Sequence, residues 1–114
     1  MDVLERVGRI GAVDLVLDHE PIPHEQVVTG SPATGSAALG SFAGHEVGVW
    51  EMTPGAMSDV EADELFVVVS GRATVEFVDT GTWMLLGPGD VVQLRAGART
   101  VWTVTETLRK VYLG

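Results

Sequence analysis

From residue 46 to residue 113 the sequence repeats one pattern, in which a short apolar run rich in valine ends at glycine, proline or a polar residue. These runs read EVGVWEM, ELFVVVS, RATVEFV, TWMLL, VVQL, TVWTV and LRKVYL. β-branched and aromatic residues favour strands, and glycine or proline between them favours tight turns. Because short strands in regular succession are typical of sandwiches and barrels, we expect an all-β domain.

Particular residues mark the turns between these runs. Thr53-Pro54-Gly55 and Gly87-Pro88-Gly89-Asp90 are strong turn sequences, and Gly71, Gly81 and Ala96-Gly97 separate the other runs. We therefore predict separate strands over residues 46–52, 64–70, 72–78, 82–86, 91–94, 100–104 and 108–113.

The first 45 residues have a different character, and we assign them to the same domain as the barrel core at 46–114. Residues 12–17 (AVDLVL) predict a first strand, and Pro21 and Pro23 then interrupt regular pairing. Residues 29–45 are rich in Gly, Ser, Ala and Thr, which predicts a lid, a dimer arm or an irregular loop. A weak helical period is present only over residues 2–10.

Composition limits what the chain can do. With 114 residues it can build one hydrophobic core, and without cysteine it has no disulfide and no thiolate metal site. Its net charge of −9 repels nucleic-acid phosphates and anionic membrane surfaces, so we expect neither as a partner. A charged start and the absence of a long apolar run predict no signal peptide and no membrane span, hence a cytoplasmic protein.

Two stretches carry more information than the strand pattern. Glu64 opens an apolar strand that reaches Gly71, and residues 87–90 precede a short strand and a turn at Gly97. Together they resemble the two signature motifs of the cupin superfamily. The resemblance implies a jelly-roll β-barrel of the cupin (RmlC-like) type.

Two further phrases narrow this resemblance. Trp50-Glu51-x-Thr53-Pro54-Gly55 and Trp102-x-Val104, with the ending Leu108-Arg109-Lys110-x-Tyr112, are similar to short single-domain cupins of the ureidoglycine aminohydrolase-like branch. The similarity covers residues 46–113. It implies a fold and no particular activity, because this superfamily supports many chemistries.

The metal ligands that the resemblance implies are mostly replaced here. Metal-dependent cupins have a His-x-His pair shortly before the glutamate and another histidine in the second motif, whereas this chain has Met-Ser-Asp-Val at 57–60 and Thr100. Of four expected ligands only Glu64 remains, and one carboxylate does not make a transition-metal site. We therefore expect no metal and no other cofactor, and no ureidoglycine aminohydrolase activity.

Glu64 and Lys110 are the candidate catalytic residues. The resemblance places Glu64 inside the barrel, and strand alternation puts Phe66 on the same face. A carboxylate among apolar neighbours is prepared for acid or base chemistry, or else forms a structural ion pair. If Lys110 and Tyr112 also face inward, Lys110 is the partner of Glu64, or it binds an anionic substrate; otherwise it reaches solvent along its aliphatic stem.

Aromatic and hydroxyl side chains form the predicted walls of the site. Thr100 and Trp102 alternate together, and the indole N–H of Trp102 can act as a donor. For Trp50 and Glu51 we expect the ring to face inward, because a second buried carboxylate costs more. The predicted substrate-binding residues are Trp50, Phe66, Thr100, Trp102 and Tyr112.

Two other groups of side chains offer cation ligands. Residues 51–64 hold five acids and no base, which could suit a hard cation but is more typical of a solvated acidic loop. His19, His24 and His45 each precede a glutamate without forming a known zinc pattern, so we expect them in surface loops.

Three functions remain open at this point. The first is a metal-independent small-molecule site in the barrel, with acid/base chemistry of the isomerase, cyclase or deaminase type. The second is a non-catalytic module that binds or senses a small metabolite. The third is an interaction protein that assembles through residues 29–45. In each case we expect a homodimer, the commonest small assembly.

Overall fold

The structure, a computed structural model, describes residues 2–114. Its helical segments are α1 (Val3–Val7) and the single 3-10 turn η1 (His24–Gln26). Within the described residues, no helix has the length and apolar character that a membrane crossing would need. The strands are β1 (Glu20–Pro21), β2 (Val27–Thr29), β3 (Ala33–Phe42), β4 (His45–Met52), β5 (Gly55–Val60), β6 (Glu64–Phe77), β7 (Thr82–Leu86), β8 (Val91–Leu94) and β9 (Arg99–Leu113).

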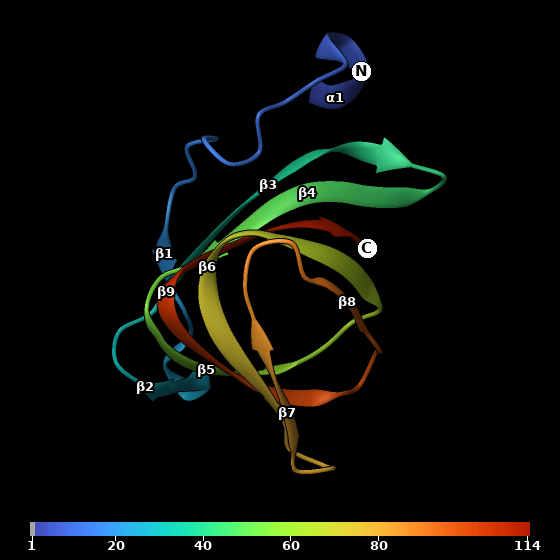
Figure 1. Ribbon diagram of the computed structural model, residues 1–114. Coiled ribbons are helices and arrows are strands. Elements are labelled where there is room, and N and C mark those ends of the chain that lie inside the picture. The colour runs from blue at the N-terminus through green and yellow to red at the C-terminus, as the bar shows by residue number, and fades with distance from the viewer. Residues whose placement is uncertain (1) are drawn as a thin grey trace.

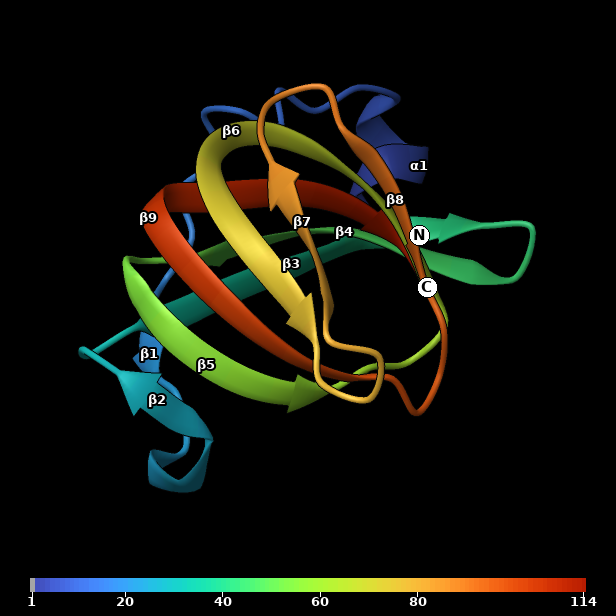
Figure 2. The ribbon, with the colours of Figure 1, turned by 60° about the horizontal axis from the view of Figure 1, so that its bottom comes forward.

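The strands form one antiparallel sheet that curls into a barrel (Figures 1 and 2). The order runs β1-β3-β4-β9-β5-β2, and β6 pairs with β7, β8 and β9. The long strand β9 is therefore central, because it pairs with β4, β5 and β6. The prediction of an all-β barrel is confirmed.

The two longest strands each join two predicted strands. β6 continues through Gly71, and β9 continues between the runs predicted at 100–104 and 108–113. The register of β6 against β9 shifts around Ser70 and Arg72, so the pair bends there. Gly71 adopts a positive φ of 91°, and a Cβ on it would collide with the carbonyl oxygen of Thr107. Gly71 thus allows close packing at a bend, and the prediction that it ends a strand was wrong.

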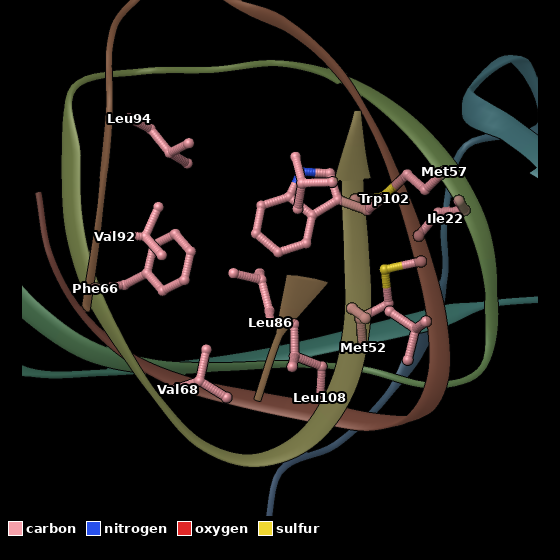
Figure 3. Packing of buried hydrophobic residues seen from close by; sticks show 13 residues of the cluster. Ile22, Met52, Met57, Phe66, Val68, Leu86, Val92, Leu94, Trp102 and Leu108 are labelled. Carbon is pink, nitrogen blue, oxygen red and sulfur yellow. The ribbon is translucent and has the colours of Figure 1, made fainter. Parts of the chain in front are cut away.

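The barrel interior is filled by one apolar cluster (Figure 3). Trp102 is 1% exposed, and its ring lies 5.8 Å from that of Phe66 and 5.6 Å from that of Trp50. Val68, Val75 and other inward side chains of β6 pack in the same cluster. The inward orientation predicted for Phe66 therefore matches its burial at 1% exposed.

The Gly- and Ser-rich segment is a strand, so the prediction of a lid or loop over residues 29–45 was wrong. β3 pairs with β4 from Thr34 opposite Met52 to Phe42 opposite His45. Its small side chains are needed because the N-terminal segment passes close by. A Cβ at Gly35 would collide with the Asp18 carbonyl oxygen. Low side-chain volume here reflects tight packing and not flexibility.

The prediction of a first strand over residues 12–17 was wrong. These residues form a turn and then an extended segment without a ladder partner. Leu17 is buried against Leu39 and Val49 on the outside of the β3–β4 hairpin. The apolar residues of this segment therefore cover a sheet face. The weak helical period at 2–10 corresponds to α1, which is capped by Asp2.

The sequence pattern missed β5 entirely. The residues from Gly55 to Val60 pair with Val104 to Arg99, which places Asp59 opposite Thr100. The segment was interpreted as part of an acidic loop because it lacks a clear apolar alternation. Its pairing with β9 brings two acids, Asp59 and Glu61, to the end of the barrel.

Candidate functional site

A cavity of about 400 Å³ opens at the end of the barrel near the β5–β6 connection. Strands β4, β5, β6 and β9 contribute to its walls. Five of the predicted site residues line it, namely Trp50, Glu64, Trp102, Lys110 and Tyr112.

The remaining two predicted residues, Phe66 and Thr100, are buried and contact the lining. The Phe66 ring packs against Trp102, and the Thr100 hydroxyl donates a hydrogen bond to Glu61. Sequence reasoning thus brought together residues that are neighbours in space, although these two do not face the cavity.

Glu64 and Lys110 form an ion pair, which is one of the alternatives that the sequence left open for Lys110. The Lys110 Nζ donates to Glu64 Oε2 at 2.7 Å. It also lies 4.4–5.0 Å from the ring centres of Phe66, Trp50 and Trp102. The antiparallel pairing of β4 and β9 sets Trp50 beside Lys110 and thereby builds this cage. Aromatic faces attract cations, so the ammonium is held by a carboxylate and three rings.

The ammonium is more deeply buried than the carboxylate. The Lys110 side chain is 6% exposed and the Glu64 side chain 21%. Lys110 therefore does not reach solvent through its stem, which excludes that alternative. A buried ammonium depends strongly on its partner, because an unpaired buried charge is costly.

Glu61 is a site residue that sequence reasoning missed. Its Oε2 accepts a hydrogen bond from the Thr100 hydroxyl at 2.7 Å and from the Trp102 indole N–H at 2.9 Å. The assignment of Glu61 to a solvated loop was therefore wrong. The alternation of Thr100 and Trp102 gave two inward donors, but their acceptor could be found only from the β5–β9 pairing.

Asp59 is the second missed residue and lines the same cavity. Burial raises the pKa of its carboxyl, and the negative charge of Glu61 raises that pKa further. The hydrogen bond from the Val60 backbone N–H and the charge of Lys110 offset only part of this effect on the pKa. The protonated form of Asp59 is thus stabilised relative to a carboxyl in water.

Tyr112 donates a hydrogen bond from its hydroxyl to Glu46 Oε2 at 2.7 Å. Burial, this hydrogen bond and the charges of Glu46 and Glu64 raise the pKa of the Tyr112 phenol to about 12. Each of these causes favours the neutral phenol over the phenolate.

The Tyr112 titration can be measured directly, because this is the only tyrosine in the chain. We expect phenolate absorbance with a pKa of about 12, and a lower pKa in Glu46→Gln. Because the pKa is raised above its ordinary value of 10.0, its contribution to stability is fully present below pH 10 and is lost toward pH 12. Circular dichroism on the same samples shows whether the chain is folded. A wild-type pKa near 10 in the folded chain would contradict the described contact.

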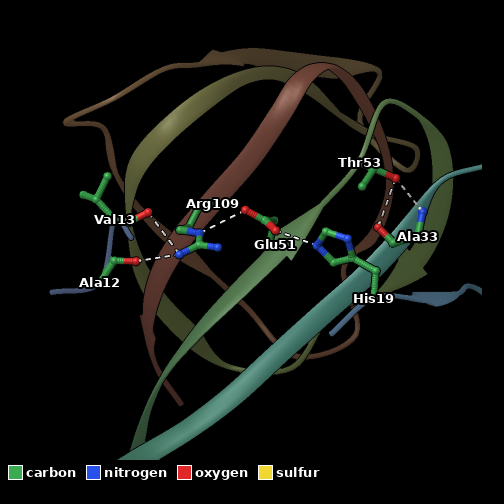
Figure 4. Close-up of polar contacts among 7 residues, drawn as sticks. All are labelled: Ala12, Val13, His19, Ala33, Glu51, Thr53 and Arg109. Carbon is green, nitrogen blue, oxygen red and sulfur yellow. Dashed lines mark hydrogen bonds and ion pairs between the residues drawn. The ribbon is translucent and has the colours of Figure 1, made fainter. Parts of the chain in front are cut away.

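A second polar network lies on the outer face of the sheet, away from the cavity (Figure 4). Arg109 Nε donates to Glu51 Oε1 at 2.9 Å, and its Nη1 donates to the carbonyl oxygens of Ala12 and Val13 at 2.8 and 3.1 Å. His19 Nε2 lies 2.5 Å from Glu51 Oε2. The network holds the N-terminal segment against β4 and β9.

The same network confirms the expected orientation of β4. Trp50 faces the cavity, whereas Glu51 faces outward to Arg109. Burial raises the pKa of Glu51, but hydrogen bonds and charge from Arg109 and His19 lower it more, so the pKa lies below its ordinary value. The role of Arg109 was not predicted, since it required knowing where residues 12–13 run.

The three histidines lie at the surface as expected, but only His19 lies in a loop. His19 contacts Glu51, His24 begins η1, and His45 begins β4, all with exposed side chains. Across residues 2–114, no group of three or more His, Cys, Asp or Glu side chains is arranged to hold a metal ion.

Comparison with protein families gives a match over residues 40–112 to the EutQ-like cupin domain. The match includes Glu64, the turn at 87–90 and the strand that carries Lys110. The chain belongs to the EutQ-like cupin family. A search of curated proteins returned no match.

Solved structures show the same cupin fold. A protein of unknown function of the DUF861 family from Pseudomonas syringae superposes with a TM-score of 0.74 at 26% identity, over 88% of this chain and 44% of that one. A putative ethanolamine utilization protein Q from Salmonella typhimurium gives a TM-score of 0.62 at 19% identity, over 71% and 68% of the two chains. This cupin thus spans less than half the length of the Pseudomonas protein.

The residues of this cupin do not fit the metal ion that the superfamily resemblance implies. Glu64, the one retained ligand position, already has the Lys110 ammonium on its Oε2. Met57 is a buried part of the core, and the Thr100 hydroxyl is committed to Glu61. A divalent ion at Glu64 would meet a fixed positive charge and too few donors.

Proposed function

We propose that this cupin has a metal-independent small-molecule site in the barrel cavity, with acid/base chemistry of the isomerase, cyclase or deaminase type. The observation that carries the proposal is the Glu64–Lys110 pair inside three aromatic rings, at the position where the superfamily resemblance implies a metal ligand. A cation tethered to the chain supplies fixed positive charge there. The site then works through protons, hydrogen bonds and shape.

Asp59 is the acid/base group that the geometry favours most. Glu64 is paired with Lys110, and Glu61 accepts from two donors, whereas the hydrogen bond described for Asp59 comes from the backbone N–H of Val60. A carboxylate with a raised pKa that faces a cavity is a stronger base, so it can take a proton from a ligand and return it. Glu64 and Lys110 then position polar groups of that ligand.

A non-catalytic binding module is the second candidate. It is supported by the same hydrogen bonds, because Glu61 and Glu64 already have internal partners and are held rigidly. Rigid, preorganised acceptors serve recognition as well as they serve catalysis.

The three tryptophans allow a direct test of the site. Trp50 and Trp102 line the cavity, whereas Trp83 on β7 is 64% exposed and lies outside it. In an NMR screen of small metabolites, a ligand of the site should shift the indole N–H signals of Trp50 and Trp102 but not that of Trp83. Replacement of Trp83 with phenylalanine assigns the control signal.

The outcome separates the candidates. A compound that shifts both cavity indoles and is converted by the wild type, but not by Asp59→Asn, supports the enzyme. A compound that binds in the same way and is recovered unchanged supports the binding module. A broad metabolite library that shifts neither indole would overturn the small-molecule site.

A further inference from the structure

Acidic side chains outnumber basic ones in the lining of the cavity. Four lining residues are acids: Asp59, Glu61, Asp63 and Glu64. Lys110 is the single Lys, Arg or His among the described residues that line it. Because the Lys110 ammonium is already bound to Glu64, the other carboxylates have no cationic partner in the wall.

The surroundings of Lys110 show that the cavity wall stabilises a cation. Lys110 Nζ is surrounded by a carboxylate oxygen and the faces of Trp50, Phe66 and Trp102. This tethered ammonium lines the cavity, so the walls already include groups that stabilise positive charge. An anion entering the same space would meet the surplus carboxylates.

Several carboxylate oxygens of the acids that line the cavity accept no hydrogen bond from the described residues. Within residues 2–114, the side-chain donors to Glu61 both reach Oε2, and the donor to Glu64 also reaches Oε2. The Oε1 atoms of both residues and Oδ2 of Asp59 have no donor from the described part of the chain. An ammonium group has three donors and matches this set of acceptors.

We propose that the cavity takes a small organic cation, specifically a primary amine, with Asp59 and Glu61 as its anionic contacts. The proposal rests on the proposed function and names its ligand class. A volume of about 400 Å³ admits an aliphatic chain of several carbons beside Trp50. The surplus negative charge selects amines over neutral and anionic molecules of the same size.

The test uses three probes of matched length: 4-aminobutan-1-ol, butane-1,4-diol and 4-hydroxybutanoate. We expect the amine to shift the Trp50 and Trp102 indole signals with an affinity at least about ten-fold above that of the diol, and the acid to bind more weakly still. Titration calorimetry gives the dissociation constants. Equal or tighter binding of the diol or the acid would overturn the amine proposal while leaving the small-molecule site intact.

Charge-removing variants locate the binding. Glu61→Gln removes the charge and keeps an acceptor for Thr100 and Trp102. Asp59→Asn removes the charge on β5 and keeps an acceptor for the Val60 N–H. Each should weaken amine binding at least about ten-fold, whereas Glu76→Gln, an exposed acid on the outer face of β6, should change it less than about two-fold. An equal loss in all three variants would mean a diffuse attraction by the net charge and would overturn the proposal. So would an amine that shifts neither cavity indole at millimolar concentration.

Discussion

Replacing Glu64 with alanine should lower the free energy of unfolding by about 3 kcal/mol, because it leaves the Lys110 ammonium buried without a carboxylate. The value lies at the lower end of the range for broken buried pairs, since Glu64 is itself 21% exposed. Replacing Lys110 with methionine should cost less. The carboxylate that remains can still reach water in the cavity, whereas a stranded ammonium at 6% exposure cannot.

Chemical denaturation at pH 7 measures the free energies of unfolding of the wild type, Glu64→Ala and Lys110→Met. Combining Glu64→Leu with Lys110→Met should recover part of the loss, because two apolar side chains leave no unpaired charge. Glu76→Ala serves as the truncation control and should stay within about 0.5 kcal/mol of the wild type. A Glu64→Ala variant as stable as that control would show that Lys110 does not depend on the pair.

Replacing Arg109 with methionine should cost about 3 to 5 kcal/mol and release the N-terminal segment. Arg109 is 6% exposed and binds Glu51 and the carbonyl oxygens of Ala12 and Val13. Its loss removes these bonds and leaves His19 as the remaining side-chain partner of Glu51 within residues 2–114. Hydrogen exchange and limited proteolysis should show faster opening at residues 12–17 than in the barrel.

Glu51→Gln is the matched control, because it keeps an acceptor for Arg109 and both carbonyl contacts. It should cost about 1 kcal/mol and leave residues 12–17 protected. Since the pKa of Glu51 is lowered, its contribution to stability is present above its ordinary value of 4.5 and is lost as the pH falls through the folded pKa. The difference between wild type and Glu51→Gln should therefore shrink in acid. Equal protection of residues 12–17 in Arg109→Met and wild type would contradict this role.

From residue 64 onward, β7 and β8 were predicted with their observed bounds, whereas β6 and β9 were each predicted as two strands. Turn residues such as Gly81 and Gly87 bound the apolar runs of β7 and β8, which was enough to predict both strands. Where the pattern failed, tertiary contacts decided the outcome. The small residues of β3 resemble a loop, yet they are required by the close approach of the N-terminal segment at Gly35.

Site residues could be predicted only where the alternation of side chains along a single strand, or the family resemblance, was enough to show that they face inward. The resemblance placed Glu64 inside the barrel, and alternation along the last strand offered an inward Lys110 as one alternative, which the pairing of β6 with β9 bears out. The side-chain size argument placed Trp50 inward. Asp59 and Glu61 were missed, because their positions depend on the pairing of β5 with β9, and no local pattern reports that register. A carboxylic acid can be recognised in the sequence, but the strand register decides whether its side chain faces the cavity.

Equilibrium dialysis against Mn²⁺, Fe²⁺ and Zn²⁺ at physiological ionic strength, followed by elemental analysis, tests whether a tethered ammonium has replaced a metal at Glu64. Our account predicts no stoichiometric ion in the wild type and no difference between the wild type and Glu64→Gln. One ion bound per chain in the wild type and lost in Glu64→Gln would contradict it.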